Sequence, residues 1–188
     1  MSDPFFFGYG SLVNRRTHDF AEVYPAQISG WRRTWRHTAL REVAFLTAVP
    51  EPGARMEGLI AAVPQADWAS LDAREWSYAR HAVGHLVAHE AGRGVHVEVF
   101  AVAPEHSAPP TVRHPVFLSY IDTVVQGYLH TFGAAGAERF FATTEGWDLP
   151  VVNDRAAPRY SRAQALGAAD RDFVDTHLAR LGADLVVT

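Results

Sequence analysis

The chain of 188 residues contains no cysteine. Without cysteine it can form no disulfide, use no thiol nucleophile and bind no metal through sulfur. It also lacks an excess of positive charge, because 17 lysines and arginines stand against 21 acidic residues, giving a net charge of −4. A chain with this balance has no general attraction for nucleic acid or for anionic membranes. We therefore expect neither as a partner.

Long apolar runs are missing as well. No stretch approaches the length that spans a bilayer, and Asp3 and Pro4 stand where a secretory signal has basic residues. The sequence therefore predicts a cytoplasmic protein. Residues 1–188 suffice for a single domain with a full core.

The stretch that organises the chain comes first. Phe5–Phe7 is typical of a strand buried on both faces, and it leads into a loop containing Tyr9, Gly10, Ser11 and Leu12. Glycine allows another molecule to approach the backbone closely, and N–H groups at the carboxyl end of a strand can bind a carbonyl oxygen or a carboxylate. The alternative is a core strand followed by a tight turn.

Strands dominate the first half of the chain and helices the second, which indicates an α+β fold. We expect strands over residues 26–38, 43–49, 56–63, 78–89 and 95–102. Pro50–Gly53 is expected to turn the chain, and Pro64 to open a helix that ends near Glu75. Residues 104–115 suggest an irregular connection, and helices are expected over residues 116–129, 137–142 and 170–181.

Basic and aromatic residues alternate in the first long strand. At strand period Trp31, Arg33 and Trp35 share one face, and Arg32 and Arg36 share the other. This pattern also occurs on surfaces that bind nucleic acid. A half-buried strand with a charged outer face explains it without a partner, in agreement with the acidic total.

Glu75 is the candidate general base. Leu71 and Glu75 lie four residues apart in a helix, so both point toward the core if Leu71 does. A carboxylate in that position is partly desolvated, which should raise its pKa toward the range useful for a base. The alternative is an ion pair between Glu75 and Arg74 or Arg80 at the surface.

Histidine and serine offer two further possibilities. His81, His85 and His89 are spaced by four, but on a strand they share one face and span too far for a single metal ion. A catalytic triad using Ser11 is the other option. No glycine follows Ser11 as a nucleophile elbow requires, so we expect neither a metal site nor a triad.

Five segments together resemble the γ-glutamylcyclotransferase-like superfamily, and the chain is identified as a bacterial member. They occur in the family's order, and they are Phe7–Leu12, Gly30–Arg33, Glu57–Ile60, Leu71–Glu75 with Tyr78–Arg80, and Tyr120–Gly127. Two positions depart from the pattern. Asn14 follows the loop serine later than the family's asparagine does, and Trp76 replaces a glycine.

The resemblance implies an α+β fold with a mixed, barrel-like β-sheet, flanking helices and extra C-terminal helices. It implies an enzyme of glutathione metabolism, an acyltransferase or lyase, that cyclises a γ-glutamyl amide to 5-oxoproline and releases an amine or amino acid. No cofactor and no metal are implied. Glu75 is the implied base, and the implied substrate-binding residues are Tyr9, Gly10, Ser11, Leu12 and Tyr120.

Two other functions stay open beside this one. The chain could be a related enzyme that acts on a γ-glutamylamine or removes a γ-glutamyl protecting group, or a non-catalytic binding protein of the same fold. The matching part ends near Gly127, and the chain from about residue 145 is an extension. The long segment Glu145–Ala169 is expected to pack over or beside the pocket and to help choose the leaving group. The sequence does not predict an oligomeric state.

Overall fold

The computed structural model describes residues 3–37, 43–102, 107–108 and 114–186. Most of the irregular connection expected over residues 104–115 lies outside these residues. The strands of the large sheet are β1 (Phe5–Gly8), β2 (Val23–Arg36), β3 (Phe45–Ala62), β4 (Ala79–Ala82), β5 (Val87–His89), β6 (Val97–Ala101) and β8 (Thr144–Glu145). The small sheet contains β7 (Val116–Phe117), β9 (Pro150–Val152) and β10 (Asp184–Val186). The α-helices are α1 (Ala69–Arg74), α2 (Leu118–Thr143) and α3 (Ala168–Arg180).

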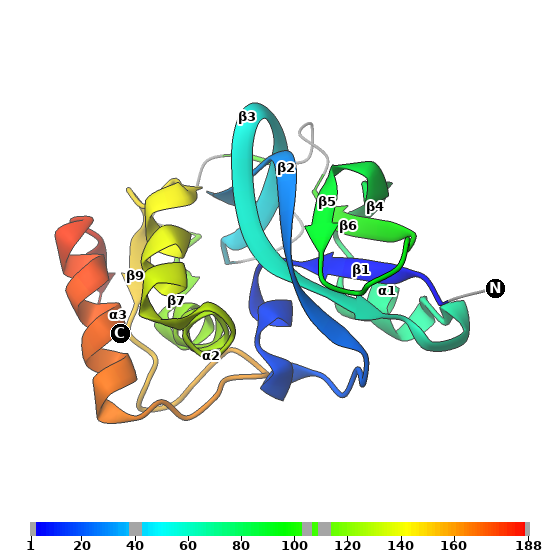
Figure 1. The fold of residues 1–188 in the computed structure, drawn as a ribbon. Helices are drawn as coiled ribbons and strands as arrows, with labels where there is room; N and C mark the ends of the chain where they lie inside the picture. The colour runs from blue at the N-terminus through cyan, green and yellow to red at the C-terminus, as the bar shows by residue number, and fades with distance from the viewer. Residues whose placement is uncertain (1–2, 38–42, 103–106, 109–113, 187–188) are drawn as a thin grey trace.

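Strand β1 lies inside the large sheet, antiparallel to β3 and parallel to β6. Its three phenylalanines are 0–1% exposed, which confirms the strand buried on both faces. The strand order is β4-β6-β1-β3-β2-β5, with β8 also beside β2, and within the described residues the sheet is not closed. Helices α2 and α3 lie beside this sheet together with the small one (Figure 1). The α+β fold with a mixed sheet is confirmed.

Pro50–Gly53 does not reverse the chain, so the predicted turn is wrong. Strand β3 runs through these residues and pairs with β2 on both sides of them, Ser29 with Arg55 and Trp31 with Pro50. The extra residues of β3 oppose Gly30 alone and form a bulge. Gly30 and Gly53 both take positive φ there, 75° and 85°. Proline and glycine bend a strand at a bulge as well as ending it, which is why the local signal misled.

The strand expected over residues 78–89 is divided in two. Strand β4 pairs with β6, then a 3-10 turn at Gly84–Leu86 carries the chain to β5, which pairs with β2. His81 and His89 therefore lie on different strands, and the prediction that the three histidines share one face is wrong. Among the described residues no group of three or more histidine, aspartate or glutamate side chains could hold a metal ion.

Helix α2 is attached to the turn that follows β1. The Asn14 side-chain amide donates to the Thr123 carbonyl at 2.8 Å and to Gln126 Oε1 at 3.0 Å. Gly127 allows this approach, since a Cβ there would lie 2.6 Å from the Asn14 nitrogen. The helix is interrupted at Gly133, where φ is 67°, as its sequence predicts. Neither α2 nor any other helix of the described chain is long and apolar enough to cross a membrane.

Candidate active site

Two adjoining cavities open at the carboxyl end of β1. The narrow inner cavity, of about 30 Å³, is lined by Gly8–Leu12, and the wider outer cavity, of about 320 Å³, is lined in part by Arg159–Arg162. Four side chains line both cavities and mark their junction: Ser11, Glu75, Tyr78 and Tyr120.

The loop after β1 presents its backbone to the inner cavity. Its first turn is closed by the Val13 N–H donating to the Gly10 carbonyl at 3.0 Å. The N–H groups of Gly10, Ser11 and Leu12 precede that bond, so the turn itself does not satisfy them. A Cβ on Gly10 would lie 2.8 Å from the Tyr120 hydroxyl oxygen, so only glycine permits this contact without a shift.

Glu75 points as the helical spacing predicts. It caps the C-terminal end of α1, Leu71 of the same helix face is 3% exposed, and the Glu75 side chain is 16% exposed at the cavity junction. The alternative ion pair is also present, because Arg74 Nε lies 3.3 Å from Glu75 Oε1. The two readings are compatible because this pair lies at the cavity rather than on the open surface.

Arg74 is a site residue that the sequence reasoning considered only as a surface partner. Its guanidinium donates to the Thr17 carbonyl at 2.9 Å and to Ser11 Oγ at 3.3 Å, so it joins α1 to the β1 loop. Burial lowers the pKa of Arg74, and the neighbouring Glu75 opposes that shift. Ser11 Oγ accepts from Arg74, and no hydrogen bond found among the described residues joins it to a histidine.

Tyr120 stands between the two cavities. Its ring packs edge-on against Trp35 and Tyr160, with centroids 5.9 and 5.0 Å away. Burial raises the pKa of Tyr120 well above its ordinary value, and Tyr160 and Glu75 raise it further. The hydroxyl is therefore a neutral hydrogen-bonding group beside Gly10 at neutral pH.

Tyr9 lines the inner cavity, but its hydroxyl is used by the sheet. That hydroxyl donates to the Phe100 carbonyl at 2.6 Å and accepts from the Ala48 N–H at 3.1 Å. The Tyr9 carbonyl in turn accepts from the Tyr128 hydroxyl at 2.9 Å. Only the ring and backbone of Tyr9 are left to contact a ligand. Its role is therefore to fix the loop.

Tyr78 belongs to the Tyr-x-Arg motif, for which the sequence predicts no site role, yet it lies at the cavity junction. Its hydroxyl donates to the Leu46 carbonyl at 2.8 Å, which places the ring beside Phe45. The Tyr-x-Arg pattern after Glu75 was the available signal. It marks the return of the chain from α1 to the sheet.

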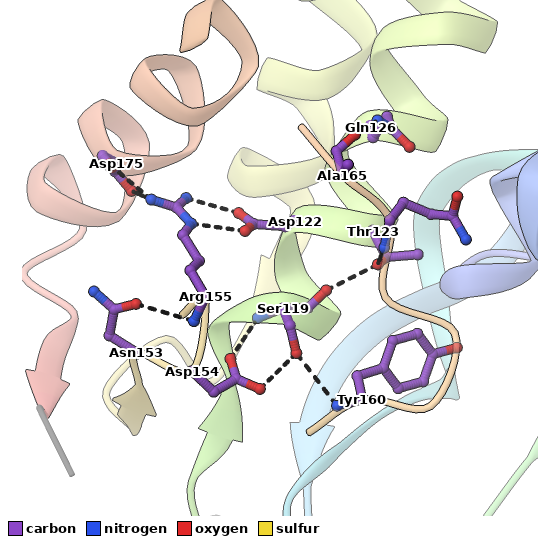
Figure 2. Close-up of polar contacts among 11 residues, drawn as sticks. Ser119, Asp122, Thr123, Gln126, Asn153, Asp154, Arg155, Tyr160, Ala165 and Asp175 are labelled. Carbon is purple, nitrogen blue, oxygen red and sulfur yellow. Dashed lines mark hydrogen bonds and ion pairs between the residues drawn. The ribbon is translucent and has the colours of Figure 1, made fainter. Parts of the chain in front are cut away.

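The segment after β9 reaches the outer cavity because Asp154 attaches it to α2 (Figure 2). The buried Asp154 carboxylate accepts from the Ser119 N–H at 2.8 Å, from Ser119 Oγ at 2.6 Å and from the Arg159 N–H at 2.8 Å. Nothing in the sequence singled out Asp154, since its donors lie on α2 and in the following turn.

Arg155 adds a second attachment beside the first. Its guanidinium donates to both Asp122 oxygens at 2.7 Å and to Asp175 Oδ2 at 2.9 Å, so it joins α2 to α3 (Figure 2). These contacts place Arg159–Arg162 along the outer cavity, as expected for part of Glu145–Ala169.

Comparison with known families identifies the chain. The sequence model described as "Gamma-glutamyl cyclotransferase, AIG2-like" matches residues 6–117. The chain belongs to this family. The matched residues of this cyclotransferase-family chain include Gly8–Leu12 and Glu75, whereas Tyr120 and Arg159–Arg162 lie beyond them. No curated protein matches it in sequence.

Solved structures show the same fold. A gamma-glutamyl cyclotransferase superposes with a TM-score of 0.58 at 16% identity, covering 93% of this chain and 99% of that one. An uncharacterized protein from Homo sapiens gives 0.60 at 16% identity with the same coverage. YkqA from Bacillus subtilis gives 0.55 at 19% identity, covering 78% of this chain and 57% of its own. The superfamily predicted from sequence is confirmed, while a bacterial origin stays a prediction.

Proposed function

We propose that this protein is an enzyme that cleaves a γ-glutamyl amide by intramolecular cyclisation, releasing 5-oxoproline and an amine or amino acid. Family membership supports this reaction class. The observation that carries the proposal is the junction of the two cavities, where the Glu75 carboxylate lines the same space as the Gly8–Leu12 loop.

The proposed reaction uses the substrate's own nucleophile. The α-amine attacks the γ-carbonyl carbon, a new C–N bond closes the five-membered ring, and the amide C–N bond to the leaving group breaks. The enzyme's main task is to hold amine and carbonyl in contact, and such orientation lowers the barrier substantially. A cavity with one narrow and one wide part suits a folded glutamyl group joined to a variable amine.

Glu75 is the proposed base. Its carboxylate removes one proton from the ammonium group before the attack and a second from the ring nitrogen after it. Both protons end on the leaving nitrogen, which departs as an ammonium ion, so no net proton is gained or lost by the protein. Arg74 beside it holds the carboxylate in place at 3.3 Å. Position at the junction allows one carboxylate to reach both nitrogens in turn.

The β1 loop and Tyr120 are the proposed substrate contacts. The tetrahedral intermediate carries a negative oxygen, and the N–H groups of Gly10 and Leu12 are donors that the loop turn leaves available. The Ser11 backbone is hydrogen-bonded to Tyr120 and so holds that side chain beside the loop. The Tyr120 hydroxyl beside Gly10 can hold a second polar group of the glutamyl moiety. In this assignment the glutamyl group lies at the cavity junction with its γ-carbonyl oxygen directed into the inner cavity, and the leaving group lies in the outer cavity.

The decisive experiment is to detect 5-oxoproline after incubation with γ-glutamyl dipeptides, glutathione and γ-glutamylamines. Release of 5-oxoproline from at least one compound supports the proposal, and the pattern separates amino acid from amine leaving groups. A thermal-shift measurement with the same compounds runs in parallel. Stabilisation without any product indicates a binding protein of this fold. If there is neither stabilisation nor product, the proposal is contradicted altogether. The cytoplasmic location stays a prediction.

A further inference from the structure

The outer cavity carries more positive than negative charge. Among the residues that the structure describes, the charged residues lining it are Arg74, Arg159 and Arg162 on the positive side and Glu75 on the negative side. Arg74 and Glu75 are paired with each other at 3.3 Å. None of the ion pairs found in the described chain involves Arg159 or Arg162. Within the described part of the chain, two positive charges thus face the cavity without an ion-pair partner.

The position of Arg159 is held by specific contacts. Its guanidinium carbon lies 4.4 Å from the centroid of the Phe117 ring, which also lines the outer cavity. Its backbone N–H donates to the buried Asp154 carboxylate. The N–H of the next residue, Tyr160, donates to Ser119 Oγ at 3.4 Å, as Figure 2 shows. Both ends of the Arg159 residue are therefore attached to the start of α2.

Arg162 comes near a charge of its own sign. It lowers the pKa of Arg74 by electrostatic repulsion, in addition to the larger effect of burial. The chain is held there by the Gln164 N–H, which donates to Thr123 Oγ1 at 3.3 Å. Arg159 and Arg162 line the same cavity, and two guanidinium groups that face one cavity favour an anion there.

We propose that the outer cavity is a carboxylate site for the leaving group, formed by Arg159 and Arg162. This inference rests on the proposed function and narrows it to γ-glutamyl amides whose amine component is an amino acid or peptide. In such a substrate the carboxylate, or the peptide chain leading to it, begins on the atom next to the leaving nitrogen. With that nitrogen at Glu75, the carboxylate points into the outer cavity, where arginine matches its geometry.

A matched pair of substrates tests the proposal. γ-Glutamylalanine and γ-glutamylalaninamide have the same shape, but the second carries a neutral carboxamide in place of the carboxylate. We expect wild-type kcat/KM to favour γ-glutamylalanine about 10-fold, as for a hydrogen-bonded charge at a partly exposed site. In Arg159→Gln/Arg162→Gln the ratio should approach 1. Added salt should reduce the wild-type ratio as well.

The control is Arg171→Gln/Arg180→Gln, which removes two positive charges as well, from exposed positions on α3 that line neither cavity. Its ratio should equal that of wild type. Calorimetric binding of the two compounds to Glu75→Gln supplies a second readout that does not depend on turnover. There the carboxylate compound should also bind about 10-fold more tightly, and the added double substitution should abolish the difference.

The outcomes separate this inference from the proposed function. Turnover of both compounds at equal rates, or a preference that survives in the double variant, overturns the carboxylate site and leaves the cyclisation intact. Selective binding of γ-glutamylalanine without any 5-oxoproline supports the carboxylate site and overturns the cyclisation. If the protein neither binds nor turns over these compounds, both the carboxylate site and the cyclisation are contradicted.

Discussion

The two halves of the site are built by different means. The inner half is lined mainly by the β1 loop and the end of α1, both within residues 6–117 that match the family, and Tyr120 of α2 completes it. It offers backbone N–H groups and one carboxylate. The outer half takes Arg159–Arg162 from a segment beyond that match, and it offers charged side chains. The first is defined by close backbone packing, the second by a polar attachment to α2.

This difference indicates a division of labour. Where packing is so close that Gly10 admits no Cβ without displacing Tyr120, geometry can vary little, as a shared reaction requires. Exposed arginines on an attached segment can change without disturbing the core, as selection among leaving groups requires. Substitutions in the inner half should therefore affect the reaction, and substitutions in the outer half should affect the choice of substrate.

The largest effect is expected for Glu75→Gln. Glutamine keeps the size and hydrogen bonding of the side chain but cannot accept the proton, so turnover should fall by roughly 10²–10⁴-fold. The measurement is 5-oxoproline release at saturating substrate. The matched control is Asp72→Asn on the same helix, which lies outside both cavities and should keep the wild-type rate. Wild-type turnover in Glu75→Gln would show that another group acts as the base.

A second large effect is expected for Gly10→Val. The β-branched side chain would enter the space of the Tyr120 hydroxyl and close the inner cavity, so kcat/KM should fall by about 100-fold, the scale set by a misplacement of about 1 Å. Gly10→Ala tests the cause. Its Cβ would lie 2.8 Å from that hydroxyl, and Tyr120→Phe removes the atom it meets.

A double-mutant cycle gives the decisive comparison for Gly10. The loss of stability caused by Gly10→Ala should be smaller in the Tyr120→Phe background than in wild type. The free energy of unfolding, from denaturant titration, measures both. Equal losses in the two backgrounds mean that the hydroxyl contact is not what requires glycine.

Asp154→Asn probes the outer half through its attachment. Asparagine cannot accept from three donors as the carboxylate does, so the free energy of unfolding should fall by about 2 kcal/mol. The selectivity between γ-glutamylalanine and γ-glutamylalaninamide should fall too, while the affinity for 5-oxoproline stays near wild type. Asp148→Asn, an exposed change in the same segment, is the control. Lost affinity for 5-oxoproline would mean that the two halves are not separable.

Tyr120→Phe distinguishes a substrate contact from a core ring. If the hydroxyl holds the glutamyl group, KM should rise about 10-fold, the equivalent of about 1.4 kcal/mol, with little change in stability. An unchanged KM would leave the ring only its packing against Trp35 and Tyr160. Initial rates over a range of substrate concentrations give the answer.

The smallest effect concerns His18, which supports the β1 loop by donating from Nε2 to the Leu12 carbonyl at 3.0 Å. Burial lowers the pKa of His18, and the positive charges of Arg74 and Arg15 lower it further. The hydrogen bond to Leu12 and the negative charge of Asp19 act in the opposite direction. Below about pH 6.5 the unfolded chain binds more protons at this histidine than the folded chain does. The His18 contribution to the free energy of unfolding is therefore fully present above that pH and is lost as the pH falls toward the folded-state pKa.

The slope of this loss is at most about 1.4 kcal/mol per pH unit, the value for a single proton. Denaturant titrations between pH 7.5 and 5 measure it. His18→Gln keeps a donor for Leu12 but cannot titrate, so its slope should be shallower than that of wild type. His130→Gln, an exposed histidine on α2, is the control and should keep the slope. Equal slopes in all three proteins would remove His18 as the source.

Sequence alone determined the features that repeat over a few residues. Three consecutive phenylalanines define a strand buried on both faces, and the four-residue spacing of Leu71 and Glu75 sets the direction of the carboxylate. The interruption of α2 at Gly133 was also foreseen. Each of these follows from backbone periodicity or from the freedom of glycine, which are properties of the local chain.

Tertiary structure decided which distant segments meet. Whether Pro50–Gly53 forms a turn or a bulge depended on the pairing of β3 with β2, and the separation of His81 from His89 depended on which edge of the sheet each strand joined. The attachment of Asp154 to Ser119, which brings Arg159 to the cavity of Glu75, has no local signature. A buried carboxylate takes whichever donors the packed chain supplies, and the packing of the whole chain determines those donors.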